Sequence, residues 1–262
     1  MSLDTEQQSN VDAVVALLRD AESILFITGA GISADSGLPT YRGVGGIYED
    51  EDLTEDGVPI EAALSGQMIE TRPEISWKHI ARIEQGCREA GFNRGHEVIT
   101  EMERHFPRVW TLTQNVDGFH RNAGTKNLID IHGDYHDLRC SRCGYRTEVA
   151  AYRDLPKIPP DCPDCGHHLR PDVVFFGEML PEEKYTKLAT QVRIGFDLVF
   201  SVGTTSVFPY IVMPVMNAFQ TGVPTIEINP GQTEVSGIVN VKISAGAAET
   251  LDAIWTGYQR TE

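Results

Sequence analysis

An apolar run that ends in closely spaced glycines constrains the fold of this chain more than any other feature. Residues 24–28 read Ile-Leu-Phe-Ile-Thr, and Gly29-Ala30-Gly31-Ile32-Ser33 follows directly. A short apolar, β-branched run is typical of a parallel strand that is buried on both faces. Glycines at its end let the backbone turn sharply and approach a phosphate, whose charge is attracted by the N–H groups of a following helix. The sequence therefore predicts a dinucleotide site near the N-terminus.

Strand and helix patterns alternate along the rest of the chain. The spacing of apolar residues predicts helices at 3–20, 61–69, 74–90, 95–105 and 247–258. It predicts strands at 23–28, 109–113, 128–131, 173–175, 198–202, 225–228 and 239–243. This order indicates an α/β protein with a Rossmann-like, doubly wound parallel sheet.

Two stretches interrupt the alternation, and we predict that they form a small inserted domain. Residues 36–84 begin with a long loop at 36–60 and continue as a helical module, whereas 136–170 carry four cysteines. The large dinucleotide-binding domain then comprises 1–35, 85–135 and 171–262. Ligands of open α/β sheets bind beyond the carboxyl ends of the strands, so we expect the site to lie between the two domains.

Four of the five cysteines have the spacing of a structural zinc site. Cys140-x-x-Cys143 and Cys162-x-x-Cys165 are separated by 18 residues, and a glycine follows each pair. Four thiolates converge on one Zn²⁺ and leave no open position for a substrate. In a reducing compartment, metal binding is favoured over two disulfides. Cys87 lies on a predicted helix and is expected to be a small buried hydrophobe.

Length and charge exclude several classes of protein. The chain has 262 residues, of which 41% are hydrophobic, and a formal net charge of −16. Nucleic-acid binding needs a basic surface, so we expect no direct nucleic-acid partner. The acidic balance suits a cationic partner such as a lysine-rich protein, or serves solubility alone. No run approaches the roughly 20 apolar residues of a membrane span, and no signal-peptide pattern opens the chain, so we expect a cytoplasmic protein without membrane contact.

The residues after the glycines differ from those of a hydride-transferring dehydrogenase. Gly29-x-Gly31-x-x-Ala34 matches a loose dinucleotide fingerprint, but no second strand leads to the acidic residues near Glu49. Instead, a loop reads Ser36-Gly37-Leu38-Pro39-Thr40-Tyr41-Arg42. Tyr41 offers an aromatic face, and Arg42 offers a fixed cation that suits a pyrophosphate or a carboxylate. Such a loop would fold over a bound nucleotide and shield its reactive bond.

Polar side chains follow four of the predicted strands. They are found in Gln114-Asn115-Val116-Asp117, His132-Gly133, Gly203-Thr204-Thr205-Ser206 and Asn229-Pro230-Gly231. The carboxyl ends of parallel strands share one edge of the sheet, so we expect these groups to meet there. Helix caps and turns use the same residue types, but carboxamides and hydroxyls with few charges also suit ribose hydroxyls and an amide-bearing ring. His132 is predicted to be the general base, because the ordinary pKa of histidine lies near working pH.

Together, these motifs resemble the sirtuin family in its prokaryotic form, whose members are NAD-dependent protein-lysine deacylases. The resemblance also rests on Phe176-Gly177-Glu178, Leu180-Pro181 and the four cysteines, which follow the family's order. It implies NAD as co-substrate, one structural Zn²⁺, and proteins that carry acylated lysine as substrates. In the family's mechanism, the acyl oxygen attacks the nicotinamide ribose as nicotinamide leaves. A ribose hydroxyl, deprotonated by His132, then attacks the acyl carbon, and the products are lysine, nicotinamide and O-acyl-ADP-ribose.

The resemblance also implies roles for individual residues. The catalytic group would be His132, Asn115 and Asp117. The nucleotide would contact Gly29, Ala30, Gly31, Ala34, Tyr41, Arg42, Gln114, Asn115, Asp117, Gly203, Thr204, Thr205, Asn229 and Ala248, with Ser206 and Gly246 as further candidates. The acylated lysine and its peptide would lie along Val174, Phe175, Phe176, Gly177 and Glu178, and the peptide would pair with 176–181 as an added strand. The zinc ligands would be Cys140, Cys143, Cys162 and Cys165.

Two positions predict the acyl group. Family members that remove negatively charged acyl groups carry a Tyr-x-x-Arg pair where this chain has Ile80 and Ile83. A carboxylate buried against two isoleucines lacks a partner, so we expect acetyl or longer apolar acyl groups rather than succinyl or malonyl. The alternatives are a desuccinylase or an ADP-ribosyltransferase on the same scaffold, a binding module that senses NAD, and a dehydrogenase, which the loop at 36–43 disfavours.

Overall fold

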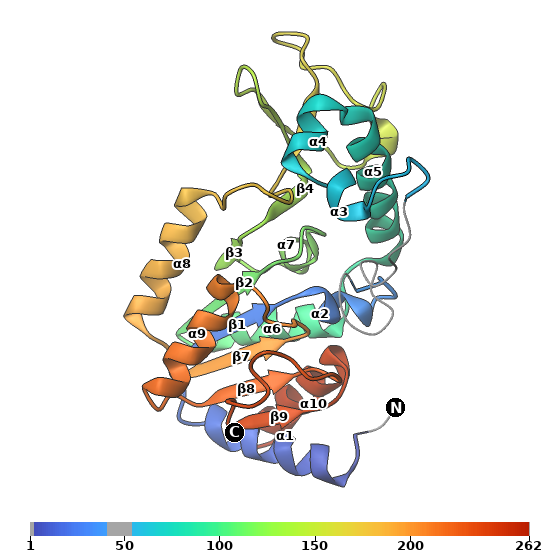
Figure 1. Ribbon diagram of the computed structural model, residues 1–262. Helices are drawn as coiled ribbons and strands as arrows, with labels where there is room; N and C mark the ends of the chain where they lie inside the picture. Colours follow the sequence, from blue (N-terminus) through green and yellow to red (C-terminus); the bar gives the residue numbers. More distant parts are fainter. Residues whose placement is uncertain (1–2, 41–53, 262) are drawn as a thin grey trace.

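The structure is a computed structural model that describes residues 3–40 and 54–261. A parallel sheet flanked by helices forms the larger lobe, and a smaller lobe lies at the end of the molecule opposite α1 (Thr5–Leu18) (Figure 1). Tyr41, Arg42 and the rest of the expected loop up to residue 53 lie outside the described residues. Within the described ranges, none of the helices combines the length and apolarity that a membrane span requires.

Six parallel strands build the main sheet. They are β1 (Ser23–Thr28), β2 (Arg108–Thr113), β3 (Leu128–Asp130), β7 (Leu198–Val202), β8 (Thr225–Ile228) and β9 (Val241–Ile243). Their spatial order is β3-β2-β1-β7-β8-β9, and every neighbouring pair is parallel. The order reverses between β1 and β7, which is where a doubly wound sheet binds its ligand. The predicted Rossmann-like sheet is confirmed.

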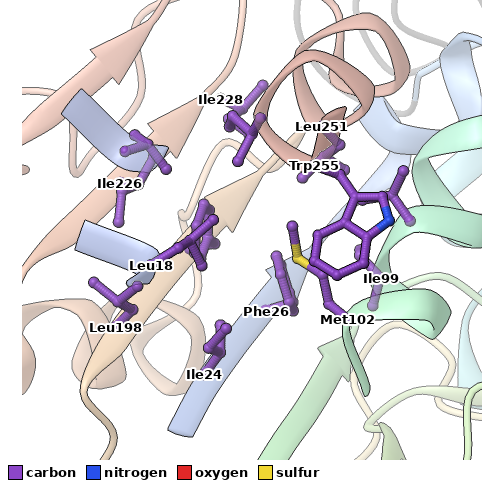
Figure 2. Packing of buried hydrophobic residues seen from close by; sticks show 14 of the residues in the cluster. Leu18, Ile24, Phe26, Ile99, Met102, Leu198, Ile226, Ile228, Leu251 and Trp255 are labelled. Carbon is purple, nitrogen blue, oxygen red and sulfur yellow. The ribbon is translucent and has the colours of Figure 1, made fainter. Parts of the chain in front are cut away.

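Helices cover both faces of this sheet. One face carries α1, α6 (Arg94–His105) and α10 (Ala247–Gln259), and the other carries α8 (Glu182–Ile194) and α9 (Pro209–Gln220) (Figure 1). Alternate residues of β1 serve the two cores: Ile24 and Phe26 face the first, and Leu25 and Ile27 face the second. All four are at most 1% exposed, which explains the continuous apolar run. Figure 2 shows the first core around Phe26.

The smaller lobe has an apolar core of its own. Its elements are α3 (Ile60–Ala63), α4 (Gly66–Thr71), α5 (Pro73–Ala90), the short helix η1 (Tyr152–Asp154), and an antiparallel sheet of β5 (Arg146–Glu148), β4 (Gly133–Cys140) and β6 (Leu169–Val173). The fully buried Trp77 donates its Nε1–H to the Leu169 carbonyl at 3.0 Å. Ile80 and Cys87 lie in this same core, so the domain boundary expected after residue 84 falls inside one packed helix, α5.

Two expectations about secondary structure are wrong. The helix expected at 61–69 is divided into α3 and α4, because Ser65 lies between them and caps α4 by accepting the Met68 N–H at 3.1 Å. The strand expected at 173–175 ends at Val173 as β6. It pairs antiparallel with β4 in the small sheet and does not join the parallel sheet.

Candidate active site

Two loops meet backbone to backbone where the strand order reverses. Gly29 and Gly31 lie at the start of α2 (Ala30–Ala34), and Gly203 follows β7. The Gly31 N–H donates to the Gly203 carbonyl at 2.7 Å, and a Cβ on Gly31 would lie 2.5 Å from the Gly203 Cα. Gly203 has a φ of 58°, in the left-handed region. Side chains are therefore excluded at the ends of β1 and β7, and the bare backbone suits close contact with a nucleotide phosphate.

Gly31→Ala is expected to lower the free energy of unfolding by about 1–3 kcal/mol, because the new methyl group would overlap the Gly203 backbone. Urea denaturation measures the effect. Gly86→Ala is the matched control. It lies inside α5, a Cβ at this position would lie 3.9 Å from the Leu38 side chain, and alanine should stabilise the helix by about 0.5–1 kcal/mol. Equal effects of the two substitutions would contradict the proposed close packing.

Ser33 of α2 joins two of the predicted catalytic side chains. Its Oγ donates to Asp117 Oδ2 at 2.7 Å and accepts from Asn115 Nδ2 at 3.1 Å. Asn115 Nδ2 also donates to the Gly29 carbonyl, and the Phe119 N–H at the start of α7 (Phe119–Ala123) donates to Asp117 Oδ1. Burial raises the pKa of Asp117 to about 6, although the bonds from Phe119 and Ser33 oppose the shift. The sequence predicts Asn115 and Asp117 but does not identify the bridging role of Ser33.

His132, between β3 and β4, is held from several sides. Its Nδ1 must carry the hydrogen, because it lies 3.0 Å from the Gln114 carbonyl, which can only accept. The lone pair is therefore on Nε2, which lies 2.7 Å from the Tyr210 hydroxyl. The His132 carbonyl accepts the Val174 N–H at 2.8 Å. Burial lowers the pKa of His132 to about 4; the Gln114 bond opposes this shift and the positive charge of Lys184 adds to it. The ring is thus a neutral imidazole with a defined tautomer.

The loop after β7 is fixed by other predicted nucleotide residues. Gln114 Nε2 donates to Thr204 Oγ1 at 2.8 Å, and Asn229 Nδ2 donates to the Thr204 carbonyl at 3.1 Å. The Thr205 carbonyl accepts the Glu234 N–H at 3.2 Å. The structure therefore brings the polar groups that follow β2, β7 and β8 together at one edge of the sheet.

The first turn of α10 lies beside α2. The Ala248 N–H donates to Asp35 Oδ2 at 2.7 Å, and a Cβ on Gly246 would lie 3.2 Å from the other oxygen of this carboxylate. Ala30 and Ala34 are the first and last residues of α2. The stretch 246–248 is therefore next to the glycine loop, and the Ala248 N–H is already bound to Asp35.

The segment expected to hold the acylated lysine is partly engaged within the small lobe. The Phe176 N–H donates to the Leu64 carbonyl, and the Phe176 carbonyl accepts the Gly66 N–H, both at 3.0 Å. Gly177 has a φ of 83°, and the chain turns there before Met179, which is 90% exposed. The backbone of Phe176 is therefore paired inside the protein, whereas the chain after Gly177 runs along the surface.

Phe175, which is expected to line the lysine stem, lies in the apolar core of the small lobe. It is 5% exposed, and the Arg170 guanidinium lies 4.4 Å from the centre of its ring. Arg170 also pairs with both oxygens of Glu178, at 2.6 and 2.7 Å. Phe175 and Glu178 thus hold the segment in place beside the half-buried Val174 and Phe176, the other apolar residues expected to contact the substrate.

The four cysteines predicted to bind zinc meet in the small lobe. All four Sγ atoms lie within 4.8 Å of one another, with 3.6 Å between Cys140 and Cys165 and 3.5 Å between Cys143 and Cys162. None of them forms a disulfide. Sulfur atoms bound tetrahedrally to Zn²⁺ at about 2.3 Å lie roughly 3.8 Å apart, so this cluster fits one structural zinc ion. Cys87 is buried away from the cluster, as expected, and burial raises its pKa to about 12.

The chain is similar to members of one protein family along most of its length. The model of the Sir2 family matches residues 29–209. The NAD-dependent protein deacylase 2 of Pseudomonas aeruginosa is 48% identical over 251 residues, which cover 95% of this chain and 97% of that protein. The NAD-dependent protein deacylase of Aquifex aeolicus is 35% identical over 235 residues, which cover 89% and 94%.

Solved structures show the same likeness. A complex of a Sir2 homologue with NAD superposes with a TM-score of 0.85 at 30% sequence identity and covers 99% of this chain and 96% of that one. A variant of a Sir2 homologue in complex with 2′-O-acetyl ADP ribose gives a TM-score of 0.82 at 30% identity, with 99% and 98% covered.

Proposed function

Because the chain belongs to the Sir2 family, we propose that this NAD-dependent protein-lysine deacylase removes acetyl and other apolar acyl groups from lysine. The products would be free lysine, nicotinamide and O-acyl-ADP-ribose. One observation carries the proposal: a neutral His132, with its lone pair on Nε2, lies at the sheet edge that also holds Gln114, Asn115 and the glycine loops. A base of known tautomer beside a nucleotide-binding edge is what deprotonation of a ribose hydroxyl requires.

The residues of this edge fit NAD. The bare backbone around Gly31 and Gly203 would hold the pyrophosphate, and Asn229 would hold the adenosine half. Asn115 and Asp117, both 7% exposed, would orient the nicotinamide and its ribose. When bound, NAD supplies nicotinamide as a leaving group and ADP-ribose as the acceptor of the acyl group. His132 would take the proton from the ribose hydroxyl on Nε2 and so become the imidazolium.

The protein substrate would bind beside the segment 177–181. Backbone pairing with an added strand is tolerant of peptide sequence, because it uses N–H and C=O groups common to all residues. The net charge of −16 favours lysine-rich proteins and disfavours nucleic acid as a partner. The four cysteines have an arrangement that fits Zn²⁺, which favours a reducing, cytoplasmic location.

The acyl preference follows from α5. Ile80 is 3% exposed in the core of the small lobe, and Ile83 packs against the same core. Arg82, the cation between them, is bound to Glu55 at 3.0 Å. The two positions that would need a tyrosine and an arginine are therefore apolar, and a carboxylate placed there would be desolvated without a partner.

We expect kcat/KM for an acetyl-lysine peptide to exceed that for the matched succinyl-lysine peptide by about 100-fold, because several kcal/mol of desolvation would stay uncompensated. Mass spectrometry of both peptides incubated with the enzyme and NAD measures the two rates and identifies the O-acyl-ADP-ribose. Faster desuccinylation would contradict the assignment of Ile80 and Ile83. Release of nicotinamide that does not depend on either peptide would indicate ADP-ribosyl transfer in place of deacylation.

A further inference from the structure

The lone pair of the proposed base already has a partner within the protein. Tyr210 of α9 places its hydroxyl 2.7 Å from His132 Nε2, although 78 residues separate the two in the sequence. The Nδ1 hydrogen is committed to the Gln114 carbonyl, so Nε2 offers one in-plane lone pair and no hydrogen. The hydroxyl of Tyr210 must therefore be the donor in this bond.

The ionisation of Tyr210 agrees with this direction. Burial raises the pKa of Tyr210 to about 12, so the side chain is neutral and keeps its hydrogen at working pH. A donor to a neutral imidazole stabilises the neutral form and opposes protonation. The bond therefore lowers the basicity of His132 for as long as it persists.

Aromatic packing fixes Tyr210 in this place. Its ring stacks on Phe208, with centroids 5.5 Å apart and planes at 11°, and both rings meet the imidazole edge-on. The loop that leads into α9 is braced, because the Ser206 N–H donates to Thr204 Oγ1 at 3.1 Å. Among the described residues, Ser206 is the one non-glycine residue with a positive φ, at 57°. Pro209, at the first turn of α9, further restricts the backbone beside Tyr210.

We infer that Tyr210 is a positioning residue of the base: its hydroxyl holds the His132 lone pair in the free enzyme, and the ribose hydroxyl has to replace it. The inference rests on the proposed function of His132. A single lone pair cannot accept two hydrogen bonds along the same direction, so the cofactor and Tyr210 compete for it. The competition leaves the base inactive until NAD is in place and reduces the affinity for NAD.

The charged groups around His132 cannot account for a change in its titration when Tyr210 is substituted. Lys184 of α8 is the cation that acts on the ring, and it is itself bound to Asp130 of β3 at 2.9 Å. Both remain when Tyr210 is changed, so their influence cancels between the variant and the wild-type enzyme.

Tyr210→Phe tests the inference, because it removes the hydroxyl and keeps the ring that stacks on Phe208. We expect the dissociation constant for NAD, measured by calorimetry without peptide, to fall roughly two- to tenfold, the usual equivalent of one hydrogen bond. The KM for NAD should fall in parallel, because the Tyr210 hydroxyl competes with NAD for the lone pair on His132 Nε2. In NMR titrations of the free enzyme, His132 should protonate at higher pH in the variant. Tyr185→Phe on α8, where the side chain is 48% exposed, is the matched control and should change none of these quantities.

Two results would overturn the inference. A lower kcat with unchanged NAD affinity would mean that the hydroxyl acts in the chemical step. An unchanged titration of His132 would mean that the hydroxyl does not hold the lone pair. Tyr210→Leu gives the same titration test should the phenylalanine variant fold poorly. The proposed function itself fails on a different result, wild-type enzyme that does not deacylate, and the NMR titration still reports on Tyr210 in that case.

Discussion

His132→Ala is expected to lower kcat/KM for an acetyl-lysine peptide by about 10²–10⁴-fold, the usual contribution of a positioned general base. The imidazole is the group at the sheet edge whose lone pair is fixed by a hydrogen bond on the opposite ring nitrogen. Alanine removes that lone pair and leaves the carboxamides and glycine loops that bind the nucleotide. NAD-dependent deacylation followed by mass spectrometry measures the rate.

The effect of His132→Ala should be chemical and not structural. The variant should keep its zinc and its thermal midpoint within a few degrees, because the His132 backbone remains bonded to Val174. His105→Ala, which changes an exposed histidine on α6, is the matched control and should keep wild-type activity. Wild-type rates in His132→Ala would show that another group deprotonates the ribose.

Loss of zinc has the second large expected effect, and it acts on stability. Cys162→Ala should reduce the metal content below one ion per chain and unfold the small lobe. Structural zinc sites contribute apparent binding energies of about 10–16 kcal/mol in small peptides, which equals or exceeds the total stability of a typical domain. Cys140 and Cys162 are also part of the apolar core around Trp77, so the loss of the ion exposes that core. Metal analysis and urea denaturation measure the two effects.

The fifth cysteine offers the control. Cys87 lies in the same core but is outside the four-sulfur cluster, and its Sγ contacts the Tyr135 hydroxyl at 3.6 Å. Cys87→Ala should keep one zinc per chain and lose only about 1 kcal/mol, as for a small cavity. A zinc-free Cys162→Ala protein with wild-type stability would show that the ion does not hold the small lobe together.

The strands of the main sheet could be predicted because each is buried on both faces. A strand such as β1 must then be apolar at every position, and that pattern is visible locally. Helices α8 and α9 give weaker signals. Leu188 is the buried residue of α8, and Pro214 lies inside α9, where proline usually argues against a helix. β6 also lacks a strand pattern, because Arg170 and Pro171 lie within it. Arg170 is 1% exposed, and its charge is compensated by the pair with Glu178 and by a hydrogen bond to the Val173 carbonyl.

In the candidate site, too, residues in local motifs could be predicted and residues that depend on distant contacts could not. Gly31, Asn115, Asp117 and the cysteine pairs could be proposed as site residues, because each lies in a short motif whose chemistry needs those residue types. Ser33 could not be identified as a bridge, since its two partners lie more than 80 residues away in sequence. Phe175 could not be assigned to the core from the sequence. The pattern around an apolar residue next to a strand is the same whether the side chain faces a ligand or, as here, a guanidinium.

The sequence by itself determined the parallel sheet, the four-cysteine cluster that fits zinc and the histidine that follows β3, because these features depend on local spacing and on side-chain chemistry. Only the tertiary structure decided that Ser33 links Asn115 to Asp117 and that the Tyr210 hydroxyl lies on His132 Nε2. Those contacts join segments that the crossover connections of the sheet bring together. Their existence depends on how helices pack across the sheet edge, and no short window of sequence encodes that packing.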